Sequence, residues 1–200
     1  MRHIGIMGGA FDPIHTGHLL AAEAARDGAG LDEVWFIPSA VSPLKANEPG
    51  MSGEQRYEMV CEAIKGNEAF RALDLELHRG GVSYSIDTVT ELQSRYPDCS
   101  FAYIIGSDRI HDLHRWHRIG ELAERIAFIG LERPSDALRT EALPNWLKER
   151  LTMVDMPAIG ISSTAIRQRL AEGRSVRYAV PEPVYQYIRR HKLYEARRND

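Results

Sequence analysis

Short, unbroken apolar runs recur along this chain of 200 residues, and each is followed by a segment with the composition of a helix. Runs that do not alternate between apolar and polar residues are typical of strands buried on both faces. They cover residues 3–7, 33–38, 72–77, 101–106, 126–131 and 151–156. The pattern predicts an α/β fold in which right-handed crossovers connect the strands of a parallel sheet.

The segments between the runs supply the helices that would cover both faces of this sheet. Helices are predicted within residues 17–27, 53–66, 85–96, 162–173 and 181–194. The expected fold class is therefore a Rossmann-like, doubly wound parallel sheet in a single domain, residues 1–200, with residues 160–192 forming the C-terminal helical part. Ligands of such folds bind at the carboxyl ends of the strands.

Charge and composition limit the classes of partner. The chain has 25 Lys and Arg against 28 Asp and Glu, a net charge of −3, and it has no basic stripe outside residues 189–198. Binding to nucleic acid is therefore not expected. Two cysteines without a Cys-x-x-Cys pair favour a reducing compartment, and no apolar run approaches the ~20 residues of a membrane span. We expect a cytoplasmic protein without membrane contact.

The sequence "GGAFDPIHTGH", residues 8–18, directly follows the first predicted strand. Gly8 and Gly9 would allow a ligand to approach the bare backbone, and residues 12–13 (Asp-Pro) set a turn before a helix that begins near Thr16 or Gly17. The first helical turn would therefore lie at the ligand-binding edge of the sheet.

Two histidines, His15 and His18, lie at the start of this helix. Backbone N–H groups at a helix N-terminus attract phosphate, and a nearby imidazole can donate to phosphate oxygens or to charge that develops during transfer. Taken alone, such a pair is more often an ordinary glycine-rich turn with exposed histidines. A zinc site is disfavoured because no third ligand has convincing spacing.

The sequence "GISSTAIRQRL", residues 160–170, repeats this arrangement near the other end of the chain. It follows the last predicted strand and opens a helix, with Ser162 or Ser163 as the N-cap and Thr164 and Arg167 in the first turns. The chain lacks the glycine spacing of P-loop and dinucleotide-binding motifs, so phosphate chemistry would depend on these two segments.

Both segments resemble signatures of the nucleotidyltransferase superfamily: Gly-x-Phe-x-Pro-x-His-x-Gly-His and Ile-Ser-Ser-Thr-x-Ile-Arg. Residues 81–89 ("GVSYSIDTV") and 106–116 ("GSDRIHDLHRW") are similar to further segments of bacterial nicotinate-nucleotide adenylyltransferases, so that the resemblance covers nearly the whole chain. It implies transfer of the adenylyl group of ATP to nicotinate mononucleotide, with release of pyrophosphate, in NAD biosynthesis.

The resemblance also implies which residues form the site. His18 would contact the transition state, His15 would orient the triphosphate, and Arg167 would bind the β- and γ-phosphates together with Lys45. The residues assigned to ATP and its phosphates are Gly8, Gly9, Phe11, Lys45, Gly106, Asp108, Ser162, Ser163 and Thr164. Those assigned to nicotinate mononucleotide are Tyr84, Ser85, Trp116 and Arg133. For Trp116, the alternative is ordinary core packing.

Some positions depart from the family pattern. Ser42 and Leu44 replace a Pro and a His of a family loop, so that any role of that histidine is lost here. Val82 replaces a Pro, which restores a backbone N–H and is expected to loosen the acceptor turn. No metal site is assigned among His111, His114 and His117, because the third ring would drift off the common helix face. Mg²⁺ is expected mainly on the phosphates of ATP.

Other functions remain open from the sequence. The same chemistry could act on nicotinamide mononucleotide or another phosphorylated acceptor. A protein from a different class, a non-catalytic sensor of adenine nucleotides, would bind ATP without turnover. A synthetase of the aminoacyl-tRNA type is excluded by size. The expected partners are ATP and nicotinate mononucleotide, and the sequence leaves a homo-oligomer open.

Overall fold

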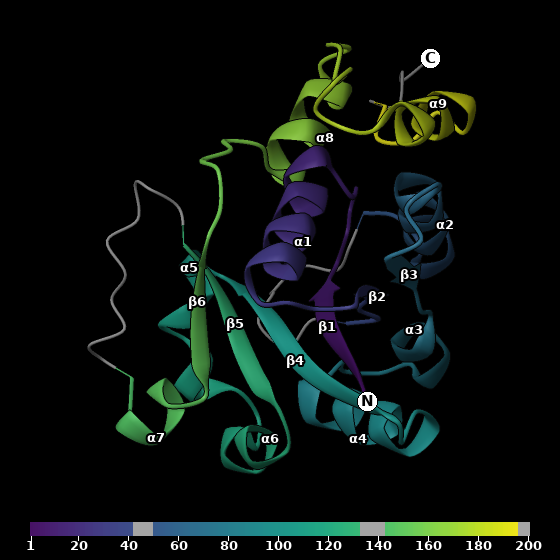
Figure 1. The fold of residues 1–200 in the computed structure, drawn as a ribbon. Helices are drawn as coiled ribbons and strands as arrows, with labels where there is room; N and C mark the ends of the chain where they lie inside the picture. The colour runs from purple at the N-terminus through teal and green to yellow at the C-terminus, as the bar shows by residue number, and fades with distance from the viewer. Residues whose placement is uncertain (42–49, 133–142, 196–200) are drawn as a thin grey trace.

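A parallel sheet forms the centre of the molecule (Figure 1). The computed structural model describes residues 1–41, 50–132 and 143–195. Its six strands in this part of the chain have the order β3-β2-β1-β4-β5-β6. They are β1 (Arg2–Gly9), β2 (Glu33–Pro38), β3 (Phe70–Ala72), β4 (Cys99–Gly106), β5 (Ala127–Glu132) and β6 (Leu151–Asp155). The order reverses direction between β1 and β4, which makes the sheet doubly wound and confirms the Rossmann-like prediction.

The unbroken apolar runs divide residue by residue between two hydrophobic cores. In β2, the side chains of Val34 and Phe36 enter one core, whereas those of Trp35 and Ile37 enter the other. This alternation follows from the period of two in a strand. Because both faces are covered, every residue of such a strand can be apolar, and this explains why the runs show no polar alternation.

Each core lies between the sheet and one set of helices (Figure 1). On one face lie α1 (Thr16–Gly28), α2 (Gly53–Ile64), α8 (Ser163–Ala171) and α9 (Glu182–Arg190). On the other lie α3 (Leu75–Arg79), α4 (Ser85–Arg95), α5 (Ser107–Ile110), the 3₁₀ turn Leu113–Arg115, α6 (Ile119–Arg125) and α7 (Asn145–Lys148). None of the helices in the described ranges is long and apolar enough to cross a membrane.

The strand predicted over residues 72–77 is wrong in most of its length. The paired strand β3 is Phe70–Ala72, and the last extended contact is the bond from Leu73 N to Phe36 O at 2.9 Å. The chain then enters α3, which ends at Arg79 and is followed by the C-cap Gly80 with a φ of 68°. Asp74 and Glu76 interrupt this run, and it is short enough to fit one helical turn as well as a strand, so the pattern could not decide between them.

The two segments singled out in the sequence begin helices at the carboxyl edge of the sheet. Gly8 and Gly9 pair with Ile37 and Pro38 at the ends of β1 and β2, and α1 begins at Thr16 as predicted. At the other end of the chain, α8 begins after the N-cap Ser162. Figure 1 shows the start of α8 close to α1, so the fold brings together segments that are distant in sequence.

Candidate active site

The connection between β1 and α1, residues 10–15, is called the β1–α1 loop below. Phe11 has a φ of 48°, a left-handed conformation that is uncommon for a bulky residue, and its side chain is only 2% exposed. Its ring meets that of His18 edge-on, with 5.1 Å between the centroids. The ring thus supports a histidine, and a contact of Phe11 with nucleotide would have to come from its backbone.

The rings of His15 and His18 are stacked at 3.7 Å between centroids, and His15 is 7% exposed. The backbone N–H of His15 donates to Nδ1 of His18 at 3.2 Å. Because Nδ1 accepts this bond, a neutral His18 carries its ring proton on Nε2. Nε2 is therefore the atom through which His18 would donate to a phosphoryl oxygen.

The second segment is joined to the first by direct hydrogen bonds. Ser163 Oγ donates to the carbonyl oxygen of Pro13 at 2.9 Å, and Arg167 Nη1 donates to that of Asp12 at 2.7 Å. Ser162 caps α8 by accepting from Ala165 N at 3.2 Å, as predicted. The N-termini of α1 and α8 therefore lie together, and their positive dipole ends suit one polyphosphate. Some first-turn N–H groups are already bonded within the protein, as that of Thr16 is to the carbonyl of Ala179 at 3.0 Å.

Thr164 and Gly106 are placed at the same edge. Thr164 is exposed in the first turn of α8, and its Oγ1 lies 3.5 Å from Arg167 Nη2. Gly106 ends β4 and forms the N-cap of α5. Lys45 and Arg133, like the family departures Ser42 and Leu44, lie outside the described residues, and so does the side chain of Asp108.

Aromatic residues gather beside Gly8 and define a second region. Trp116 meets Tyr103 of β4 edge-on at 5.2 Å between centroids, and the Trp116 indole N–H is buried with no hydrogen-bond partner in the described part of the chain. Tyr84, the N-cap of α4, lies 4.3 Å from the ring of His117. These contacts bring the predicted acceptor residues together with two that sequence reasoning missed, Tyr103 and His117.

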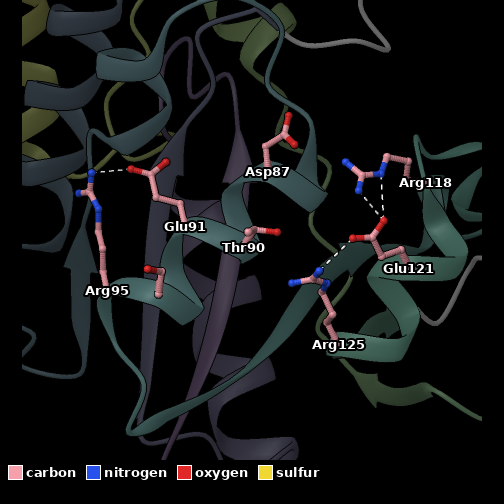
Figure 2. A pocket seen from close by; sticks show the side chains of 8 residues that line it. Asp87, Thr90, Glu91, Arg95, Arg118, Glu121 and Arg125 are labelled. Atoms are coloured by element: carbon pink, nitrogen blue, oxygen red, sulfur yellow. Dashed lines mark hydrogen bonds and ion pairs between the residues drawn. The ribbon is translucent and has the colours of Figure 1, made fainter.

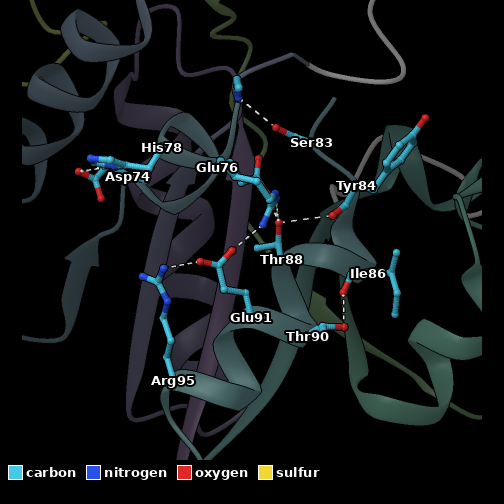
Figure 3. Close-up of polar contacts among 12 residues, drawn as sticks. Asp74, Glu76, His78, Ser83, Tyr84, Ile86, Thr88, Thr90, Glu91 and Arg95 are labelled. Carbon is cyan, nitrogen blue, oxygen red and sulfur yellow. Dashed lines mark hydrogen bonds and ion pairs between the residues drawn. The ribbon is translucent and has the colours of Figure 1, made fainter. Parts of the chain in front are cut away.

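A buried carboxylate lies beside the start of α4, close to Thr88 (Figure 3). Glu76 of α3 is 3% exposed and accepts a hydrogen bond from Thr88 Oγ1 at 2.6 Å, while Arg79 Nη2 donates to that hydroxyl at 2.8 Å. Burial raises the pKa of Glu76, and hydrogen bonds from Thr88 and Ser83 oppose the rise. In the sequence, the only sign of this buried group is that Glu76 is an acidic residue within an apolar run.

The acceptor turn, residues 82–85, is tied to the segment after β2. Ser83 N donates to the carbonyl of Val41 at 2.9 Å, and Ala40 N donates to Ser83 Oγ at 3.0 Å. Ser85 ends this turn as the first residue of α4. These contacts hold the turn that contains Val82, the position where the family has Pro.

A separate depression lies between α4 and α6, away from both segments (Figure 2). Most of its charged side chains are paired: Glu121 accepts from Arg118 and Arg125, at 2.5 and 2.9 Å, and Glu91 forms an ion pair with Arg95. It is lined by Asp87, Thr90, Glu91, Ser94, Arg95, Arg118, Glu121 and Arg125. The sequence assigned none of these residues to ATP or nicotinate mononucleotide. Because acidic and basic side chains balance here, the depression has no preference for an anion.

The histidines after β4 have different neighbours instead of a common centre. His111 Nε2 lies 3.4 Å from the carboxylate of Asp112, whereas the ring of His117 lies against that of Tyr84 at an angle of 35°. Within the described ranges, no three His, Cys, Asp or Glu side chains form a group that could hold a metal ion.

Comparison with known proteins gives consistent results. The cytidylyltransferase-like family model matches residues 6–169. A probable nicotinate-nucleotide adenylyltransferase of Oceanobacillus iheyensis is 45% identical over 199 residues, covering 100% of both chains. One of Salinibacter ruber is 43% identical over 191 residues, covering 96% of this chain and 97% of its own.

The fold is also similar to that of a solved structure of Plasmodium falciparum nicotinic acid mononucleotide adenylyltransferase complexed with NaAD. The TM-score is 0.78 at 22% identity, covering 97% of this chain and 98% of the other. At this identity the likeness concerns the fold alone. The family model and the full-length relatives together establish that the chain belongs to the cytidylyltransferase-like family, among the nicotinate-nucleotide adenylyltransferases.

Proposed function

We propose that the protein transfers the adenylyl group of ATP to nicotinate mononucleotide, giving nicotinate adenine dinucleotide and pyrophosphate in NAD biosynthesis. The observation that carries this function is the junction of the two helix N-termini, where Ser163 and Arg167 bond to the β1–α1 loop. The relatives at 45% and 43% identity carry the name of this activity.

The reaction does not require a general base. The acceptor phosphate has a second pKa near ~6, so that its attacking oxygen is already largely ionised at neutral pH. The bond that forms joins this oxygen to the α-phosphorus of ATP, and the bond that breaks releases pyrophosphate. The protein must align two anions and stabilise the charge that develops between them.

The histidine pair fits this task. Donation from His15 N to Nδ1 of His18 orients the His18 ring and leaves Nε2 as its donor atom, which we assign to an oxygen of the α-phosphoryl group in the transition state. His15, stacked beneath that ring, would orient the triphosphate. Arg167 would contact the β- and γ-phosphates, with Lys45 as a second contact.

We assign Mg²⁺ to the phosphates of ATP and to water. Among the described residues, no acidic or histidine cluster suited to a metal exists, and both carboxylate oxygens of Asp12, the acidic residue of the β1–α1 loop, already accept hydrogen bonds. When bound, the ion would neutralise charge on the leaving pyrophosphate.

The aromatic region beside Gly8 would hold the nicotinate ring. The face of Trp116 suits an electron-poor pyridine ring, and the N-terminus of α4, which begins at Ser85, suits its carboxylate. Arg133 stays a further proposed contact. The free thiols of Cys61 and Cys99 support a reducing compartment such as the cytoplasm as the place of this reaction.

Pyrophosphate release with ATP, Mg²⁺ and each acceptor in turn tests the function. We expect turnover with nicotinate mononucleotide and a much lower kcat/KM with nicotinamide mononucleotide, because donors aimed at a carboxylate are poorly matched by an amide. Equal values would contradict the acceptor assignment. ATP binding without turnover on any acceptor would favour the sensor.

A further inference from the structure

The carbonyl oxygens of the β1–α1 loop are held by side chains from distant elements. Besides the bonds from Ser163 and Arg167, Arg56 of α2 donates from Nη1 to the carbonyl of Ala10 at 2.6 Å. Arg56 is 2% exposed, and it also donates to Met51 O at 3.3 Å. The loop conformation thus depends on contacts from outside its own segment.

Asp12 is the centre of these contacts. Its side chain is 4% exposed, and each of its oxygens accepts a short hydrogen bond: Oδ1 from the hydroxyl of Tyr194 at 2.6 Å and Oδ2 from Gly50 N at 2.7 Å. Arg167 Nη1 lies 3.9 Å from Oδ2 while it donates to the Asp12 carbonyl. One buried carboxylate therefore joins the loop to segments up to 182 residues away.

The C-terminal segment adopts an unfavourable backbone to deliver Tyr194. After α9, Lys192 and Tyr194 have φ values of 50° and 63°. Left-handed conformations are unfavourable for residues with a side chain, because Cβ comes too close to the backbone carbonyl oxygen. Leu193 between them is buried in the core, and its N–H donates to Ile188 O at 3.0 Å. The strain is thus offset by core packing and by the bond to Asp12.

The hydroxyl of Tyr194 keeps its proton. Burial and the hydrogen bond to Asp12 both raise the pKa of Tyr194, while Arg167 and Arg56 oppose the rise. The phenol therefore stays protonated, and able to donate to Asp12, at pH values where an ordinary tyrosine would ionise.

We propose that Tyr194 is a positioning residue for the nucleotide half of the reaction: through Asp12 it holds the β1–α1 loop and Arg167 in the geometry that receives the triphosphate of ATP. This inference deepens the proposed function and rests on it for the identity of the nucleotide. The acceptor region around Trp116 lies outside the cluster of contacts, so its binding does not depend on this bond.

Tyr194→Phe removes the hydroxyl and keeps the ring. A hydrogen bond to a charged group is worth enough that we expect kcat/KM for ATP to fall about tenfold, with the KM for nicotinate mononucleotide within about twofold of its normal value. The matched control is Tyr187→Phe, because the Tyr187 hydroxyl also donates to a carboxylate, that of Glu58, but does so between α9 and α2, away from the loop. The control should retain normal kinetics.

A double-mutant cycle with Arg167→Lys tests whether Tyr194 acts through Arg167. If the two residues act as one unit, the fold decrease of kcat/KM for ATP in the double variant is smaller than the product of the decreases in the two single variants. The inference would be overturned if the fold decreases of the single variants simply multiplied in the double variant. It would also be overturned if Tyr194→Phe left the kinetics unchanged, or if it lowered kcat/KM equally for both substrates. A fall in melting temperature alone would do the same.

Calorimetric titration of the same variants with ATP separates this inference from the proposed function. If the unaltered protein releases no pyrophosphate with nicotinate mononucleotide, the proposed function fails. The role of Tyr194 is then still decided by the ATP dissociation constant, which should rise about tenfold in Tyr194→Phe and stay normal in Tyr187→Phe. An unchanged dissociation constant in Tyr194→Phe would then overturn the inference.

Discussion

The phenol oxygen of Tyr103 lies 2.1 Å from the point that a Cβ on Gly8 would occupy. Strand β1 and strand β4 are neighbours at the reversal of the sheet, so the end of β1 passes directly over this hydroxyl. Any side chain at position 8 would collide with Tyr103, so the packing of the sheet requires glycine there. A ligand that approaches the backbone at this position would require glycine for a second reason.

Gly8→Ala should therefore destabilise the protein and disturb the acceptor region, because the new methyl group displaces Tyr103 and with it Trp116. Overpacking of this kind costs about 1–3 kcal/mol, to be measured as the free energy of unfolding in urea, and the KM for nicotinate mononucleotide should rise. Adding Tyr103→Phe should restore part of the stability.

The control for Gly8→Ala is Gly120→Ala, because a Cβ at this position in α6 meets no atom within 4 Å. Alanine is the better helix former, so this variant should be as stable as the unaltered protein or slightly more so. Equal stability of Gly8→Ala and Gly120→Ala would contradict the close contact of Gly8 with Tyr103.

His18→Ala should lower kcat by ~10²–10³ and leave the ATP dissociation constant nearly unchanged, by analogy with the loss of one oxyanion-hole donor. His15→Ala should show a larger share of its loss in ATP affinity. The measurements are kcat, the ATP dissociation constant and melting temperature on one preparation. A His18→Ala protein with a lower melting temperature but normal kcat would show that this ring is structural.

Arg167→Ala should weaken the use of ATP more than that of the acceptor, because the side chain is proposed to contact the phosphates and donates to the Asp12 carbonyl. We expect the KM for ATP to rise about tenfold or more, as for the loss of a charged hydrogen bond. Gln168→Ala, at the next and exposed position of α8, serves as the control. A change confined to the acceptor's KM would refute the assignment.

Glu76→Gln should reveal a dependence of stability on pH. Burial raises the pKa of Glu76 above its ordinary value of 4.5. The folded protein then binds more protons than the unfolded chain between the two pKa values, and the free energy of unfolding falls as pH rises through this window. Relative to Glu76→Gln, which cannot ionise, the unaltered protein should lose stability as the pH rises above about 4.5.

Urea unfolding between about pH 4 and 8 measures this difference, and Glu121→Gln provides a control of opposite sign. Hydrogen bonds from Arg118 lower the pKa of Glu121, so the stability that this carboxylate contributes is present above its unfolded pKa and lost as pH falls. If the free energies of unfolding of both variants changed with pH in parallel, burial would not determine the pKa of Glu76.

Local rules in the sequence predicted much of the fold. The apolar runs marked β1, β2, β4 and β5, because strands covered on both faces tolerate few polar side chains, and they also marked the edge strand β6, in which only Val154 is buried. The start of α8 followed from the capping preference of serine. The strand predicted over residues 72–77 failed because a run this short fits a helical turn equally well. Only the packing of α3, through Leu75, in the core beside α4 and α6 determines which structure forms.

The sequence by itself therefore determined the alternation of strands and helices and the two segments that begin helices at the sheet edge, since burial and capping act within a few residues. Only the tertiary structure decided that Tyr103 lies against Gly8, that Glu76 supports the acceptor turn and that Tyr194 bonds to Asp12. The physical reason is the strand order: β1 lies between β2 and β4, and the C-terminal helices return over α1 and α2. These contacts join residues up to 182 positions apart, and no local pattern encodes them.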